Sequence, residues 1–124
     1  MSADEITLHL PRERPFFGVA HLVLGGLAVR LEISFEQLED LQVALGELLE
    51  QHETDSEITV SMRVEGDTIH ALVGPFDASL EQKLARDSGD SVGLRRVLDT
   101  VVDGVEVTNR DGQPWVELTK AMAR

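Results

Sequence analysis

One stretch of the chain decides its fold: Ile58-Thr59-Val60-Ser61-Met62-Arg63-Val64-Glu65-Gly66-Asp67-Thr68-Ile69-His70-Ala71-Leu72-Val73. Apolar and polar residues alternate in both halves of it, from Ile58 to Val64 and from Ile69 to Val73. A period of two is typical of strands that bury one face. Gly66-Asp67 lies between the halves and has the composition of a tight turn. The stretch therefore predicts a β-hairpin, which Gly74-Pro75 ends.

The residues before this hairpin predict one strand and two helices. Ser34 and Gln37 have the spacing of a capping box, which would begin a helix over residues 35–51. Residues 16–31 are so densely apolar that we expect a helix covered on more than one side, between the sheet and another helix. Residues 5–10 alternate with a period of two and predict a first strand, ended by Pro11.

The residues after the hairpin predict a further helix and a second hairpin. Residues 77–91 are polar, and Leu80 and Leu84 allow at most one short helix there. An amphipathic helix is expected over 94–101, and the last hairpin over 105–118. This order predicts an α+β fold: a two-layer α/β sandwich with a mixed, largely antiparallel sheet and three helices on one face. We expect a single domain, residues 1–124.

Composition narrows the classes of partner and of site. The chain has 124 residues, no cysteine and a formal net charge of -12. The missing cysteines exclude disulfides, thiolate zinc sites and a cysteine nucleophile. The negative charge opposes binding to nucleic acid and to anionic membranes, whereas a basic protein surface would be attracted. The acidic N-terminus and an apolar stretch too short to span a membrane predict a cytoplasmic protein.

The remaining candidate side chains give little support to catalysis. The four histidines show no metal-ligand spacing to one another, so we expect no metal site; they are His9, His21, His52 and His70. Trp115 shares its side of a strand with Glu117, which places it on the open face of the sheet as a candidate interface anchor.

Two parts of the chain carry a resemblance to a known family. Residues 35–51 form an acidic amphipathic run, and residues 93–120 combine a helix with a glycine-containing hairpin. In this order the chain resembles the ATP-binding domain of the anti-sigma factor serine kinases, within the GHKL (Bergerat-fold) ATPase superfamily. The resemblance implies ATP and Mg²⁺ as cofactors. It also implies a catalytic role for Glu47, and makes Gln51 the counterpart of the family's magnesium-binding Asn.

Three features of the family's nucleotide site are altered in this sequence. Gln51 has one methylene more than the family's Asn, which displaces the amide oxygen from the octahedral position that Mg²⁺ requires. Pro75 replaces the Asp that accepts a hydrogen bond from adenine, and Asp77 would serve only if the loop were rebuilt. Gly93 is the one glycine kept from the phosphate-binding Gly-x-Gly, and Asp90 beside it would repel phosphate.

These substitutions favour a non-catalytic regulator without a cofactor. We expect an anti-sigma-factor-like or partner-switching protein that binds a sigma factor or an anti-anti-sigma-type antagonist. The candidate docking residues lie on the acidic helix, although a solvated helix face explains them as well; they are Glu36, Glu39, Asp40 and Glu50. One alternative is an active ATP-dependent serine kinase that uses Glu47. Another is a structural subunit of a larger complex that forms a homodimer.

Overall fold

The fold is seen in a computed structural model, which describes residues 5–31, 33–51, 57–85 and 93–121. Its elements, in chain order, are β1 (Glu5–Pro11), α1 (Arg14–Leu31), α2 (Phe35–Leu49), β2 (Glu57–Glu65), β3 (Thr68–Gly74), α3 (Ala78–Ala85), α4 (Leu94–Val101), β4 (Gly104–Arg110) and β5 (Gln113–Ala121). The strands form one sheet in the order β1-β2-β3-β5-β4. The predicted α+β class and both predicted hairpins are confirmed.

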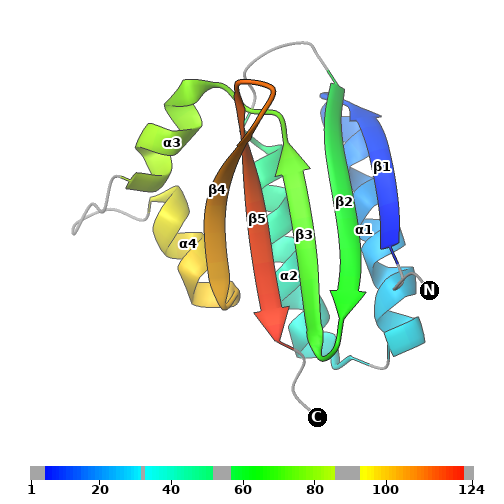
Figure 1. Ribbon diagram of the computed structural model, residues 1–124. Coiled ribbons are helices and arrows are strands. Elements are labelled where there is room, and N and C mark those ends of the chain that lie inside the picture. The colour runs from blue at the N-terminus through cyan, green and yellow to red at the C-terminus, as the bar shows by residue number, and fades with distance from the viewer. Residues whose placement is uncertain (1–4, 32, 52–56, 86–92, 122–124) are drawn as a thin grey trace.

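The sheet and the helices form the two expected layers, with two differences in detail. Every pairing between the described strands is antiparallel, because α3, α4 and β4 return the chain so that β5 runs against β3. A fourth helix, α3, occupies the first part of the polar segment 77–91; it is the one short helix that Leu80 and Leu84 allowed. Figure 1 shows α1 and α2 behind the sheet and α3 and α4 beside β4.

The core lies between the sheet and α1 and α2. It takes every second residue of the central strands, such as Ile58, Val60 and Met62 in β2, all fully buried. Leu45 and Leu48 of α2 meet this face from the other layer. The residues between them, such as Ser61, point to the opposite face, which no described helix covers. An antiparallel sheet tolerates such a face because its polar side chains remain in water.

The predicted capping box at the start of α2 is confirmed. The Ser34 hydroxyl accepts a hydrogen bond from the Gln37 backbone N–H at 3.1 Å, and the Gln37 side chain accepts one from the Ser34 N–H at 3.2 Å. The Gln37 amide also donates to the Ala121 carbonyl at 3.2 Å, at the end of β5. One side chain therefore begins α2 and fastens it to the last strand.

The expectation that α1 is covered on more than one side holds only in part. Leu24 and Leu27 are buried, but Leu22 and Val29 are each 78 % exposed on the outer side. The density of apolar residues indicates how many sides of a helix could be buried, and not how many are. Among the described elements, the sheet and α2 are the neighbours of α1, and they lie on adjacent sides of it. Within the described ranges, no helix has the length and apolarity that a membrane-spanning segment requires.

Gly74, the last residue of β3, allows a close approach by Trp115. A Cβ at Gly74 would lie 2.6 Å from Cδ2 and 2.8 Å from Cγ of the indole. The indole therefore packs directly on the backbone of β3. The Cβ of any other residue at position 74 would clash with the ring. This contact fixes Trp115 on the open face of the sheet, on the same side as Glu117, as the sequence predicts.

Gly74→Ala should destabilise the protein by about 1–3 kcal/mol, the usual cost of an atom added to a packed site. Urea unfolding measures the change. Gly25→Ala is the matched control, because a Cβ there meets nothing within 4 Å and alanine favours a helix by roughly 0.5–1 kcal/mol over glycine. If the indole contact is the cause, Trp115→Leu should remove most of the cost of Gly74→Ala; an equal cost in both backgrounds would contradict this explanation.

His21 lies in a groove between α1 and α2, beside Glu39, Gln42 and Val43. Its Nδ1 is buried and has no hydrogen-bond partner among the described residues. Burial lowers the pKa of His21 below its ordinary value of 6.5, because a charged imidazole would lose its hydration there. The neutral ring is therefore the form that suits the folded protein.

The lowered pKa of His21 has a consequence for stability. The unfolded chain binds a proton at His21 more readily, so this contribution is present above pH 6.5 and is lost as pH falls toward the lower, folded-state pKa. Urea unfolding from pH 8 to pH 5.5 should therefore show a shallower fall in stability for His21→Gln than for wild type. His9→Gln, which removes an exposed histidine, should keep the wild-type fall; identical curves for all three proteins would rule the effect out.

Candidate functional site

The residues assigned to the nucleotide site come from the end of α2 and from the starts of α3 and α4. Figure 1 shows that α2 and β3 finish at the same end of the sheet, where α3 begins. Glu47 lies in the last turn of α2, and Gln51 follows that helix. Asp77 directly precedes α3, and Gly93 directly precedes α4. Glu47, Gln51 and Asp77 thus lie toward the same end of the sheet, and Gly93 lies at the start of α4.

The Gln51 side chain is engaged at both ends of its amide. Its Nε2 donates to the Glu47 carbonyl at 3.1 Å, and its Oε1 accepts from Lys83 Nζ at 3.0 Å. Lys83 lies in the last turn of α3, so this bond ties α3 to the end of α2. The oxygen that the family would offer to Mg²⁺ therefore faces an ammonium group of the protein itself. A cation in that position opposes a second cation beside it.

Pro75 lies at the corner after β3, the position that the family resemblance assigns to the adenine-binding Asp. The Gly74–Pro75 peptide bond is cis, and the Pro75 carbonyl accepts a hydrogen bond from the Arg12 guanidinium. The same guanidinium lies over the Phe76 ring, 5.5 Å from its centroid. Phe76 is buried, and its N–H donates to the Pro114 carbonyl at 2.8 Å. The corner is therefore filled by contacts between the chain's own residues.

Asp77 and Gly93 serve as the starts of helices. Asp77 Oδ1 accepts from the Ser79 N–H at 2.8 Å, so its carboxylate begins α3. Gly93 is the N-cap of α4 and has φ of -83°, a value that other residues adopt as readily. Asp90, which would repel phosphate beside Gly93, lies outside the described residues.

The four acidic residues expected to dock a partner divide into two pairs. Asp40 accepts from Lys120 Nζ at 3.0 Å, and Glu50 forms an ion pair with Arg14 at 2.6 Å. These two carboxylates hold α2 against β5 and α1. Glu36 and Glu39 are exposed and form no ion pair with any residue in the described ranges. They are the two that remain for a partner.

Sequence reasoning missed Arg12 and Lys83, which fill the region. Arg12 follows the proline that ends β1, and Lys83 lies in a polar segment without a motif. Neither position carries a signal of its own, because each contact joins elements that lie far apart in sequence. In the part of the chain that the structure describes, no three His, Asp or Glu side chains form a group that could hold a metal ion.

The chain is similar in sequence to proteins named serine-protein kinase RsbW. No family model matches the chain. The serine-protein kinase RsbW of Listeria monocytogenes is 27% identical over 132 residues, covering 88% of this chain and 82% of that protein. RsbW of Bacillus subtilis is 25% identical over 134 residues, with 90% and 82% covered. RsbW of Oceanobacillus iheyensis is 31% identical over a shorter match of 94 residues.

Solved structures agree on the fold. The structure of RsbU and RsbW domains from Mycobacterium tuberculosis superposes with a TM-score of 0.71 at 15% identity, and the match covers 98% of this chain and 32% of that one. The SiaB–SiaC complex of Pseudomonas aeruginosa gives 0.53 at 10% identity. The resemblance to the anti-sigma factor serine kinases is thereby confirmed: the chain is a homologue of the RsbW serine-protein kinases and has the fold of an RsbW domain.

Proposed function

We propose that this chain is a partner-switching regulatory protein that binds a sigma factor or an anti-anti-sigma-type antagonist and no longer binds ATP. The observation that carries the proposal is the engagement of Gln51 by Lys83. The position that corresponds to the family's magnesium ligand is bonded to a cation of α3 at 3.0 Å. An incoming Mg²⁺ would have to break this bond and would still meet an amide displaced by one methylene.

The adenine corner supports the same conclusion. Adenine needs an acceptor for its amino group, and Pro75 has no polar side chain to provide one. Its carbonyl, the remaining acceptor of this residue, is bonded to Arg12. A nucleotide would therefore have to displace the Arg12 guanidinium from both Pro75 and Phe76. Since unpaired polar groups each cost about 1–3 kcal/mol, losing two such contacts weakens binding by about 2–6 kcal/mol, or roughly 30-fold to 10⁴-fold.

The exposed carboxylates of α2 support a role in partner binding. Glu36 and Glu39 lie on one helix face, three residues apart, and no basic residue of the described chain neutralises them. A net charge of -12 extends this negative surface beyond the helix. A partner with basic side chains would be attracted to this face and oriented by it. Sigma factors bind DNA and therefore carry basic surfaces of this kind.

An active serine kinase is the second candidate, because the relatives bear that name. Glu47 remains at the position of the catalytic Glu, half-buried in the last turn of α2.

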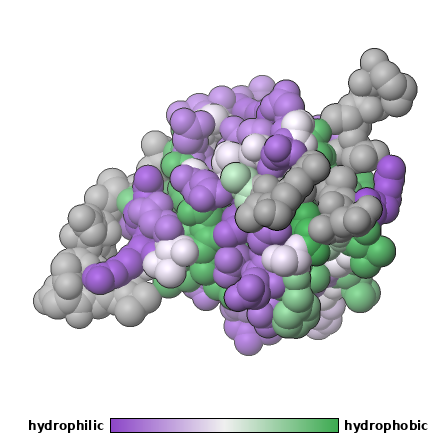
Figure 2. All heavy atoms as spheres, turned by 90° about the horizontal axis from the view of Figure 1, so that it is seen from below, coloured by the Kyte–Doolittle hydropathy of each residue, from purple (hydrophilic) through white to green (hydrophobic). Residues whose placement is uncertain are grey.

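A homodimeric structural subunit is the third candidate. The exposed Leu22 and Val29 favour it, and Figure 2 shows apolar residues at the surface on the side of α1. The kinase and the homodimeric subunit would both have the same fold as the regulator. They differ from it in their ligand, which is ATP for the kinase and a second copy of the chain for the subunit.

Calorimetric titration with millimolar Mg-ATP separates the regulator from the kinase. We expect no saturable heat, because the magnesium ligand and the adenine acceptor are both missing. RsbW of Bacillus subtilis, titrated under the same conditions, serves as the positive control. Saturable, magnesium-dependent binding to this chain would instead support the kinase and would count against the loss of ATP.

Charge reversal tests the docking face. The double variant Glu36→Lys, Glu39→Lys should weaken binding to a sigma factor or antagonist of the same genome by about tenfold or more, since like charges now oppose. Bacterial two-hybrid screening identifies the partner, and surface plasmon resonance gives the affinity. Glu57→Lys changes an exposed carboxylate away from α2 and is the control. If the double variant and Glu57→Lys bind the partner with equal affinity, this face of α2 is not part of the interface.

A further inference from the structure

The open face of the sheet carries a cavity of about 500 Å³, on the side away from the helices. Its lining includes Thr7, Ser61, Arg63, Leu72, Arg110 and Trp115. Small-molecule sites span roughly 300–1,000 Å³ and combine apolar surface with a few polar groups. The volume and the lining both fall within that description. The residues at the end of α2 take no part in it.

Arg110 and Trp115 form one end of this cavity. The Arg110 guanidinium lies over the indole, 5.5 Å from its centroid, and the indole rests on Gly74. Arg110 forms no ion pair with any residue of the described chain, although the whole sequence contains 23 acidic residues. A guanidinium held against an aromatic ring keeps its N–H donors available in a fixed plane. This end therefore presents an uncompensated positive charge on a supported side chain.

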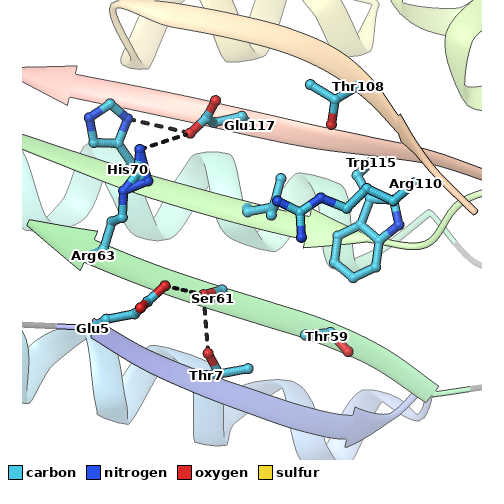
Figure 3. A pocket seen from close by; sticks show the side chains of 11 residues that line it. Glu5, Thr7, Thr59, Ser61, Arg63, His70, Thr108, Arg110, Trp115 and Glu117 are labelled. Atoms are coloured by element: carbon cyan, nitrogen blue, oxygen red, sulfur yellow. Dashed lines mark hydrogen bonds and ion pairs between the residues drawn. The ribbon is translucent and has the colours of Figure 1, made fainter.

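The other end of the cavity is acidic and internally paired. Arg63 lies 3.7 Å from Glu117 and 3.8 Å from Glu65, and His70 lies 3.5 Å and 3.4 Å from the same two carboxylates. Figure 3 shows Arg63, His70 and Glu117 gathered away from Arg110, with Ser61 bonded to Glu5 and Thr7 of the neighbouring strand β1. Among the described residues, a ligand in the cavity thus meets one cation without an ion pair, Arg110, at one end and carboxylates at the other.

We propose that this cavity binds a small organic acid with a single carboxylate and an apolar body. The carboxylate pairs with the Arg110 guanidinium, whose planar donors match it in a bidentate geometry. The apolar body lies against Leu72 and the accessible edge of Trp115, both in the lining. A second negative charge would approach Glu117 and Glu5 and be repelled. The proposal is independent of the proposed function, because it uses none of the residues of that site.

Phenylacetate is a suitable probe, and its neutral amide is the matched control. Trp115 is the one tryptophan of the chain, so a single indole N–H resonance reports on the cavity in ¹H–¹⁵N NMR. We expect phenylacetate to shift this resonance saturably. Phenylacetamide should bind at least about tenfold more weakly, the lower limit for losing a hydrogen bond between charged groups. Phenylmalonate, with its second carboxylate, should also bind more weakly than phenylacetate.

Variants locate the charge that is responsible. Arg110→Gln should reduce the affinity for phenylacetate at least about tenfold, whereas Arg110→Lys should reduce it less, because a charge remains. Arg95→Gln removes an equal charge from α4, where Arg95 pairs with Asp99 at 3.1 Å, and should leave the affinity unchanged. Equal binding of acid and amide, equal effects of Arg110→Gln and Arg95→Gln, or no saturable shift would each overturn the proposal.

Discussion

The burial of one face of β2 and β3 against α1 and α2 is the constraint on which the rest of the structure depends. Ile58, Val60 and Met62 are fully buried, and their partners across the hairpin are fixed by the register that pairs Met62 with Ala71. Because strand side chains alternate, this burial also determines what points outward. A slip of one residue in β3 would bury His70 and expose Ile69. The cavity on the open face is thus a consequence of how the opposite face is packed.

The parts of the fold that depend on neighbouring residues could be predicted from the sequence, and the parts that depend on packing could not. The hairpins and the capping box at Ser34 follow from local patterns, and all are present. The bonds of Lys83 to Gln51 and of Arg12 to Pro75 span 32 and 63 residues. No local sequence pattern predicts them, because the two partners lie far apart in the chain. The exposed side of α1 was missed for the same reason. Apolar density indicates that a helix is buried but does not reveal which of its sides find a neighbour.

Contacts between the chain's own residues connect the elements in the region to which the family resemblance assigns the nucleotide site. Arg14 pairs with Glu50 at the end of α2, and Lys83 binds Gln51 immediately after it. Asp77 begins α3, and Phe76 is buried beneath Arg12. The pair of Arg14 with Glu50 joins α1 to the end of α2, and the bond from Lys83 to Gln51 joins α3 to the same end. In this homologue of the RsbW kinases, the contacts of Lys83 and Arg12 form part of the scaffold of the fold.

The bond from Gln37 to the Ala121 carbonyl bears on when α2 can dock during synthesis. Its two ends are separated by 84 residues, and the neighbouring pair of Asp40 with Lys120 by 80. During synthesis the start of α2 leaves the ribosome long before its partner strand exists. The helix can form its local turns early, but its final docking waits for β5 to emerge. A nascent chain halted before β5 would therefore present the apolar side of α2 to chaperones instead of to its own sheet.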